Sequence, residues 1–125
     1  MAVFTNEITE AWNNREAATV FTTVSADGIS NSIYATCVSK FSDDKLLIAD
    51  NFFSKTKENL LNGSKFANLL FITKEGKAYQ VKGTVERLTE GPEFDDMKTW
   101  NGERPGHAVA VLHIEEVYSG AEKLV

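Results

Sequence analysis

The chain has 125 residues, of which 42% are apolar and 25% are charged, and this balance is typical of one soluble globular domain. Eighteen acidic residues against thirteen basic ones give a formal charge of −5, which argues against nucleic acid and anionic membranes as main partners. The single cysteine excludes an intramolecular disulfide, and no apolar run approaches the roughly 20 residues of a membrane span. We therefore expect residues 1–125 to form one domain in the cytoplasm, since the N-terminus also lacks the basic and apolar regions of a signal peptide.

Periodicity and turn signals predict three short helices and six or seven strands. Helices are expected where apolar residues recur every three or four positions, and strands where β-branched and aromatic residues lie between turn residues. The expected order is a helix over 5–15, strands over 18–25, 29–38 and 45–50, a helix over 55–61, strands over 66–73 and 78–88, a helix over 91–100 and a strand over 107–117. Because hairpin-linked strands dominate, this order predicts a mainly β fold with helical additions, a largely antiparallel barrel.

Several finer expectations follow from the same patterns. The strand after Gly28 is expected to continue towards Phe41, and Cys37 within it is expected to be buried and inert. The nearly all-apolar segment 66–73 predicts a strand buried on both faces. Gly83 indicates a bulge or a close approach of two backbones. The last seven residues predict no element.

The segment from Asp50 to Asn59 carries the strongest chemical signal. It joins an expected strand to an expected helix, with Leu60 and Leu61 on the inner face of that helix. At the first turn lie two hydroxyl and two ammonium side chains: Ser54, Lys55, Thr56 and Lys57. Together with the free N–H groups and the positive dipole end of a helix start, they suit a phosphate, although the glycines of a Walker loop are absent. An ordinary helix start with Ser54 as N-cap and solvated lysines remains the alternative.

Three motifs in sequence order make residues 18–117 resemble a known family. Asp27-Gly28 precedes a strand that holds SIYATC (Ser32–Cys37), SKTKEN (Ser54–Asn59) matches a Lys-Thr-x-x-Asn pattern, and Gly91–Phe94 reads GPEF. Their order and spacing resemble the flavin-binding split β-barrel family, which contains pyridoxamine 5′-phosphate oxidase-like proteins and small FMN-binding proteins. The resemblance implies a split antiparallel barrel that binds FMN.

The resemblance also implies which residues surround the cofactor. The phosphate would lie at the helix start, the ring beside the second strand, and the loop after the third strand over the ring or the ribityl chain. A homodimer is implied, with FMN at the interface and an aromatic side chain from the second chain. The implied cofactor residues are Ile33, Tyr34, Ala35, Thr36, Asn51, Phe52, Phe53, Ser54, Lys55, Thr56 and, on position alone, Trp100.

Other interpretations of these residues remain open. Tyr34 and Thr36 share a strand face, so they could form a polar site or merely face solvent. Phe52 and Phe53 are adjacent on a loop, so we expect one of them to be exposed or to cover a ligand. His107 and His113 lie about 20 Å apart on one expected strand, too far to share a metal ion, and no metal site is predicted.

The function that these features favour is an FMN-dependent oxidoreductase that works by hydride or electron transfer, with no residue required as general acid or base. A non-catalytic FMN electron carrier is the first alternative. A cofactor-free barrel dimer, or one that binds haem or a deazaflavin, is another. The substrate or redox partner is left open.

Overall fold

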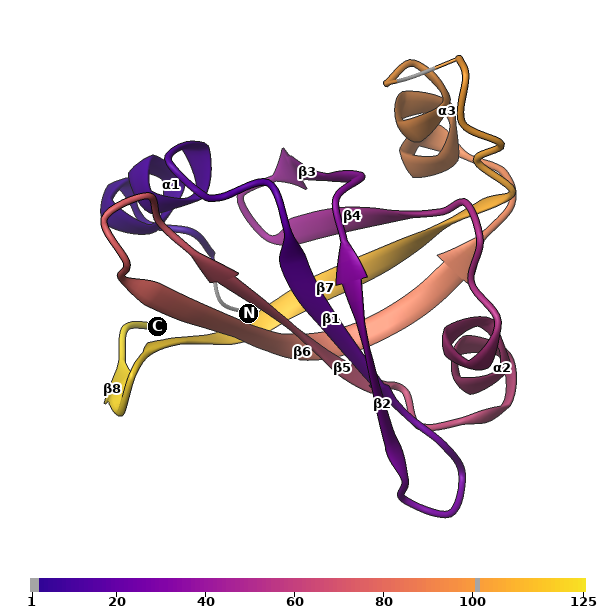
Figure 1. The fold of residues 1–125 in the computed structure, drawn as a ribbon, viewed down its shortest axis with the longest axis horizontal. Helices are drawn as coiled ribbons and strands as arrows, with labels where there is room; N and C mark the ends of the chain where they lie inside the picture. The colour runs from indigo at the N-terminus through magenta and orange to yellow at the C-terminus, as the bar shows by residue number, and fades with distance from the viewer. Residues whose placement is uncertain (1–2, 101) are drawn as a thin grey trace.

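The computed structural model describes residues 3–100 and 102–125 (Figure 1). In this part of the chain three helices and eight strands are present. They are α1 (Asn6–Asn13), β1 (Thr19–Val24), β2 (Ser30–Ala35), β3 (Val38–Ser42), β4 (Lys45–Asp50), α2 (Lys55–Asn62), β5 (Phe66–Ile72), β6 (Ala78–Leu88), α3 (Pro92–Lys98), β7 (Ala108–Ser119) and β8 (Glu122–Lys123). None of the helices in these residues is long and apolar enough to span a membrane.

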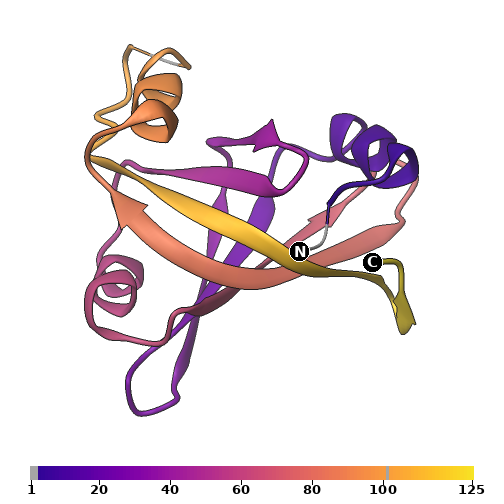
Figure 2. The same cartoon turned by 180° about the vertical axis from the view of Figure 1, so that it is seen from behind.

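One curled antiparallel sheet forms a split barrel. Its strand order is β2-β1-β5-β6-β7-β4-β3, with β8 added to β7. The two ends of this path, β2 and β3, are joined by only Thr36 and Cys37, so the sheet must curl until its ends meet. The expected split antiparallel barrel is therefore confirmed. Figures 1 and 2 show α1 at one end of the sheet and both α2 and α3 at the other.

The barrel interior holds the main core. Phe21, Leu46, Leu69 and Leu112 are fully buried there, on four different strands. At one end α1 closes the barrel by placing Trp12 edge-on against Phe71, with ring centroids 5.1 Å apart. Trp12 is thus a core residue.

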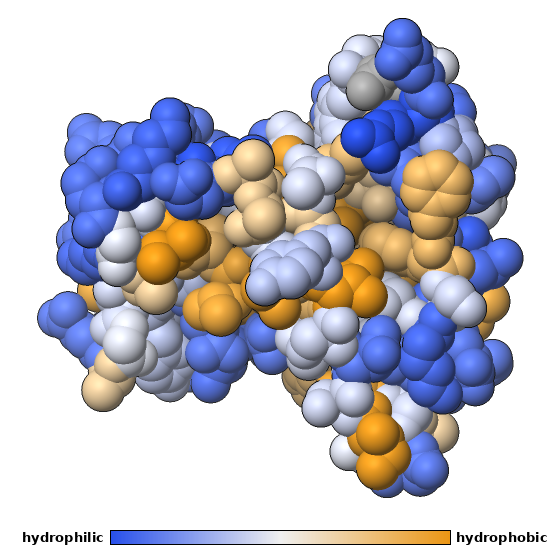
Figure 3. Space-filling model, viewed as in Figure 1, coloured by the Kyte–Doolittle hydropathy of each residue, from blue (hydrophilic) through white to orange (hydrophobic). Residues whose placement is uncertain are grey.

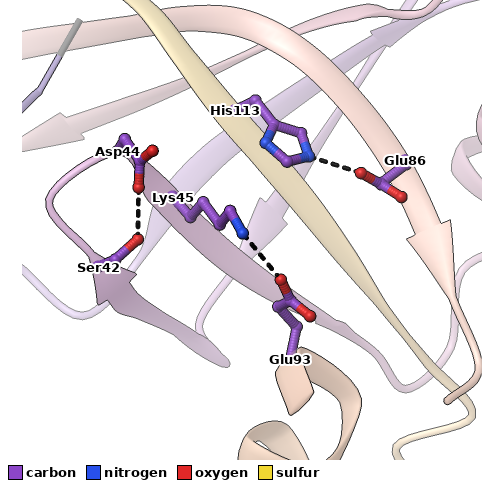
Figure 4. A network of polar contacts seen from close by, with 6 residues as sticks. All are labelled: Ser42, Asp44, Lys45, Glu86, Glu93 and His113. Carbon is purple, nitrogen blue, oxygen red and sulfur yellow. Dashed lines mark hydrogen bonds and ion pairs between the residues drawn. The ribbon is translucent and has the colours of Figure 1, made fainter. Parts of the chain in front are cut away.

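A smaller apolar cluster attaches α3 to the outer side of the sheet. Met97 of α3 packs with Leu47 of β4 and Val111 of β7. Polar contacts support the same junction, and Figure 4 shows them from close by. Lys45 Nζ lies 3.1 Å from Glu93 Oε2 and so joins β4 to the start of α3. Next to it, His113 Nε2 lies 2.6 Å from Glu86 Oε2 and links β7 to β6.

The structure corrects some local expectations. The strand after Gly28 does not run on to Phe41 but breaks at Thr36 and Cys37, where the barrel turns its corner. Strand β5 is buried on one face only in the single chain, because Phe66, Leu70 and Ile72 are 60%, 40% and 40% exposed.

The C-terminal segment and α2 also depart from expectation. The tail forms β8, and Leu124 and Val125 then pack against the core. Leu61 is exposed, because a helix of eight residues has only one face towards the barrel, and Thr56 and Asn59 occupy it.

The expected bulge at Gly83 is confirmed. The register between β6 and β7 shifts at Lys82 and Gly83. A Cβ atom on Gly83 would lie 1.8 Å from the carbonyl oxygen of His113, so only glycine lets the two backbones approach this closely.

Candidate cofactor site

A cavity of about 430 Å³ lies where the barrel splits. Its walls come from β2 and the turn after it, from the loop that follows β4, and from the first turn of α2. The lining residues are Asn31, Ile33, Tyr34, Ala35, Thr36, Cys37, Ala49, Asn51, Phe52, Phe53, Ser54, Lys55, Thr56 and Arg104. This volume is in the range of small-molecule and cofactor pockets, roughly 300–1,000 Å³.

Asp50 holds the loop after β4 from behind. Its carboxylate is almost fully buried, with Oδ1 accepting the Phe53 N–H at 3.0 Å. The other oxygen, Oδ2, accepts from Nε and Nη2 of Arg87 at 3.1 and 3.0 Å. The negative charge is thus paired with Arg87, and Asp50 does not line the 430 Å³ cavity. A carboxylate close to the proposed phosphate in sequence is therefore turned away from it.

A second set of bonds joins this loop to the segment before β7. Asn51 Oδ1 accepts the Gly106 N–H at 2.9 Å, and the Asp50 carbonyl accepts the His107 N–H at 2.9 Å. These bonds bring Arg104 to the cavity wall, although it is 49 positions from Lys55 in the sequence. The cavity is therefore lined by two basic side chains.

Helix α2 is fixed to the barrel by polar side chains. The Asn59 amide donates to Thr23 Oγ1 at 3.1 Å, and the Asn31 amide donates to Thr56 Oγ1 at 3.1 Å. Because Thr56 accepts from Asn31, its own hydroxyl hydrogen is free to be donated into the cavity. Ser54 occupies the N-cap position, but its side chain makes no capping bond, so the alternative of an ordinary capped helix start loses support and the Ser54 hydroxyl remains available.

The structure gathers ten of the eleven predicted cofactor residues around this one cavity. The eleventh, Trp100, is half-buried in the α3 cluster and lines a neighbouring cavity of about 150 Å³. Of the two loop phenylalanines, Phe52 is 78% exposed while Phe53 packs against Phe21, which confirms that they point apart. Lys57 does not line the cavity, so the expected convergence of both ammonium groups is wrong.

The charges at the cavity favour an anion. Lys55 Nζ is half-exposed and lies 3.4 Å from Glu58 Oε1, a weak surface pairing that leaves the ammonium accessible. Within the described part of the chain, no hydrogen bond or ion pair holds the Arg104 guanidinium. Asp27, on the nearby hairpin turn, has a lowered pKa because Ser25 and its own backbone N–H donate to its carboxylate, with a smaller contribution from Lys55.

Comparison with known proteins identifies the family. A family model described as pyridoxamine 5′-phosphate oxidase matches residues 4–120. The chain belongs to this family. It is also 35% identical over 104 residues to the uncharacterized protein MJ0282 of Methanocaldococcus jannaschii, an alignment that covers 78% of this chain and 68% of the relative.

Several solved structures share the fold. HupZ of Group A Streptococcus has a TM-score of 0.81 at 24% identity, covering 93% of each chain. An FMN-binding protein from Syntrophomonas wolfei has a TM-score of 0.75 at 20% identity, covering 90% of this chain and 83% of the other. HutZ, a haem storage protein from Vibrio cholerae, has a TM-score of 0.70 at 16% identity, covering 94% and 95%. At these identities the likeness shows the split barrel alone.

Sequence reasoning missed three features of the site. Arg104 lies in a polar loop far along the chain, where only its position between Gly102 and Pro105 hinted at a fixed conformation. Asn31 shares a strand face with Ile33, and alternation alone could have placed it at the cavity. Cys37 was expected to be buried, but the break between β2 and β3 leaves it half-buried on the cavity wall. No cluster of three or more potential metal ligands is present in residues 3–100 and 102–125.

Proposed function

We propose that this family member binds FMN in the 430 Å³ cavity, with the phosphate at the first turn of α2. One observation supports this most directly: Lys55, Arg104 and the hydroxyls of Ser54 and Thr56 line the same cavity as the first turn of α2. These are donors and positive charges, the groups that recognise a phosphate. The buried Asp50–Arg87 pair keeps the nearby carboxylate from opposing it.

Bound FMN supplies hydride or electron transfer, and the protein positions and tunes it. Lys55 and Arg104 would balance the phosphate charge, and the β2 side of the cavity would lie along the ring. Phe52, exposed at the rim, would shield the bound cofactor from water. No side chain is needed as general acid or base, so the proposed activity is that of a flavin-dependent oxidoreductase.

We further propose that the functional unit is a homodimer with the cofactor at its interface. The outer face of β2, β1 and β5 carries a cross-strand row of Tyr34, Val20 and Leu70, and Tyr34 also lines the cavity. In Figure 1 these strands cross the middle of the view, and Figure 3 shows apolar side chains gathered in the same place. A second copy packed on this face would cover exposed apolar side chains and close the cavity beside Tyr34.

A flavin titration tests the cofactor. We expect FMN fluorescence to be quenched on adding protein, saturating at one FMN per chain, with riboflavin binding much more weakly because it lacks the phosphate. Equal binding of FMN and riboflavin would contradict the proposed phosphate site. A haem or deazaflavin spectrum in the purified protein would contradict FMN as the resident cofactor. Tyr34 and Cys37 of the larger cavity are of residue types that can ligate haem iron, so the absorption spectrum is needed to separate haem from flavin.

Steady-state kinetics separates an enzyme from an electron carrier. An oxidoreductase should consume NADH or NADPH, whereas a carrier should leave both unused and be reduced rapidly by a redox protein. The second outcome would retain the FMN site and replace the enzymatic assignment.

A further inference from the structure

The 150 Å³ cavity next to the proposed flavin site has the features of a second binding site. Met97 and Trp100 of the α3 region form its apolar side, and Arg104 and Asn51 form its polar side. It shares Cys37, Ala49, Asn51 and Arg104 with the larger cavity, so the two spaces are adjacent. A ligand in the smaller space would therefore contact whatever occupies the larger one.

Asn51 points to a ligand that accepts hydrogen bonds. The residue is only 8% exposed, and its Oδ1 is assigned as the oxygen because it accepts the Gly106 N–H at 2.9 Å. The Nδ2 group, a donor of two hydrogens, has no acceptor among the described residues, and Asn51 lines both cavities. No buried side-chain nitrogen or oxygen of the described residues lacks a partner, so Nδ2 is open to the cavity and can donate to a ligand oxygen there.

The remaining polar groups at the smaller cavity select the same ligand chemistry. Arg104 adds further donors and a positive charge with no ion-pair partner in the described part of the chain. Lys98 does not compete with it, because its Nζ donates to the carbonyls of Pro105 and Gly106 at 3.0 and 3.4 Å. The Trp100 indole N–H is likewise occupied by Asp96 at 3.2 Å, so Trp100 offers only its ring to a ligand.

We propose that this smaller cavity is the substrate site of the flavin enzyme, and that it takes a small planar aromatic compound with a carboxylate or carbonyl oxygen. The oxygen would accept from Asn51 Nδ2 and Arg104, and the ring would pack against Trp100 and Met97. A cavity of 150 Å³ accommodates a molecule of about the size of benzene with a small substituent. This substrate class rests on the proposed function, because only a bound flavin would make the adjacent space a substrate site.

The experiment uses benzoate as the probe and the indole N–H resonances of the two tryptophans as the readout. The Trp100 resonance is the one lost in Trp100→Phe; the Trp12 resonance is the internal control, because Trp12 is buried in the core at the α1 end. Benzoate should shift the Trp100 resonance saturably, with a dissociation constant of about 1 mM or below for a ligand of this size, and leave Trp12 unmoved. The FMN-loaded protein should bind benzoate too. No shift of Trp100, or competition between FMN and benzoate, would overturn the proposal.

Variants separate this proposal from that of the flavin site. Asn51→Asp keeps an oxygen for the Gly106 N–H but replaces the donor by a negative charge, so benzoate should bind at least about tenfold more weakly. Arg104 lines both cavities, so its variant is tested with benzoate in the absence of FMN. Arg104→Gln, at an exposed position, should weaken benzoate binding similarly, and it replaces Asn51→Asp as the test if Asn51→Asp alters the fold. Lys55→Ala, which touches only the larger cavity, should leave benzoate binding unchanged while weakening FMN. Unaltered benzoate binding in both Asn51→Asp and Arg104→Gln would contradict the proposed contacts. If the unmodified protein binds benzoate but not FMN, only the flavin site is contradicted.

Discussion

The ammonium group of Lys55 is the residue feature on which the flavin proposal depends most. It lines the cavity at the first turn of α2, whereas Lys57, two positions later, lines a different surface hollow with Arg87 and His107. Lys55→Ala should weaken FMN binding by about 1.5–3 kcal/mol, the value of a charge-assisted hydrogen bond, or roughly 10- to 150-fold. Lys57→Ala is the matched control with the same loss of charge, and we expect less than about a twofold change. Equal losses in fluorescence titrations of the two variants would indicate general electrostatic attraction rather than a phosphate contact.

The buried Asp50–Arg87 pair makes a separate prediction about stability. The side chain of Asp50 is 3% exposed and that of Arg87 is 11% exposed, so removing one charge leaves the other buried and unpaired. Arg87→Met should lower the free energy of unfolding by about 3–5 kcal/mol. The double variant with Asp50→Asn should be less destabilised than the sum of the two single changes, because the amide oxygen introduced by Asp50→Asn still accepts the Phe53 N–H without carrying a charge. Urea unfolding of the unmodified chain, both single variants and the double variant measures this coupling, and additive losses would contradict it.

Among elements, β6 and β7 depend on the missing side chain of Gly83. A Cβ atom would meet the His113 carbonyl, which is backbone and cannot swing away. Gly83→Ala should therefore cost about 2–4 kcal/mol of stability through forced separation of the two strands. Gly102→Ala is the control, because a Cβ atom there meets nothing within 4 Å and the residue lies on a surface loop. Thermal unfolding of both variants tests the difference, and comparable melting temperatures would refute the close approach.

The contact between α3 and β4 should depend on pH. The pKa of Glu93 is lowered from its ordinary value of 4.5, first by the hydrogen bond from its own backbone N–H and then by Lys45. A lowered folded-state pKa means that the stabilisation is fully present above the ordinary value and disappears as the pH falls through the folded-state pKa. Glu93→Gln should thus cost about 0.5–1 kcal/mol at pH 7 and nothing once Glu93 is protonated.

Asp95→Asn serves as the control for Glu93→Gln. Asp95 is a carboxylate in the same helical turn, so its replacement reports the effect of the helix dipole alone. Urea unfolding at pH 7 and at a series of lower pH values compares the variants with the unmodified chain. A loss for Glu93→Gln that does not diminish as the pH falls would show that Lys45 does not pair with its charge.

The elements that the sequence predicts best are those with complete local signals. β4 and β6 begin and end where expected, because turn residues flank each of them and alternation persists within β6. The break between β2 and β3 was not predictable in this way. Val38 and Phe41 continue the apolar pattern across it, and the break exists because the sheet must turn at Thr36 and Cys37 to close. Closure depends on the whole sheet, so the sequence of Thr36 and Cys37 alone does not indicate it.

The same distinction between local and distant signals explains the site. Ser54, Lys55 and Thr56 are contiguous, so a motif could locate them. Arg104 reaches the cavity because Gly106, two positions later, donates its N–H to Asn51, and Arg87 reaches the loop because its guanidinium donates to Asp50. Both bonds form only in the folded barrel, and nothing near Arg104 or Arg87 in the sequence indicates them. The sequence therefore predicts the end of the cavity where we propose that the phosphate binds, and it does not reveal Arg104 or the supporting Asp50–Arg87 ion pair.

At the scale of the whole molecule, the exposed face of β5 predicts how two chains associate. Phe66, Leu70 and Ile72 lie on one face of the strand. Leu70 is the register partner of Val20 on β1, and Val20 is in turn the partner of Tyr34 on β2, at the cavity. In a monomer these apolar side chains would remain in contact with water, which is unfavourable and promotes association. If a second copy covers this face, Leu70→Glu places a charge in the interface. We expect it to convert a dimer to a monomer in sedimentation equilibrium and to weaken FMN binding, since Tyr34 would lose its covering chain.

The control for Leu70→Glu is a charge change away from this face. Asp43→Lys, at the exposed turn between β3 and β4, reverses a charge and removes only a surface ion pair with Lys40. It should leave both the mass of the dimer in sedimentation equilibrium and the FMN affinity unchanged. Unfolding of Leu70→Glu should remain cooperative, because Leu70 is 40% exposed in the single chain and its removal leaves no cavity in the barrel core. If Leu70→Glu stays dimeric, the interface lies on another face. If it becomes monomeric with unchanged FMN affinity, the dimer forms here but the cavity is complete within one chain, and the partner has no part in holding the flavin.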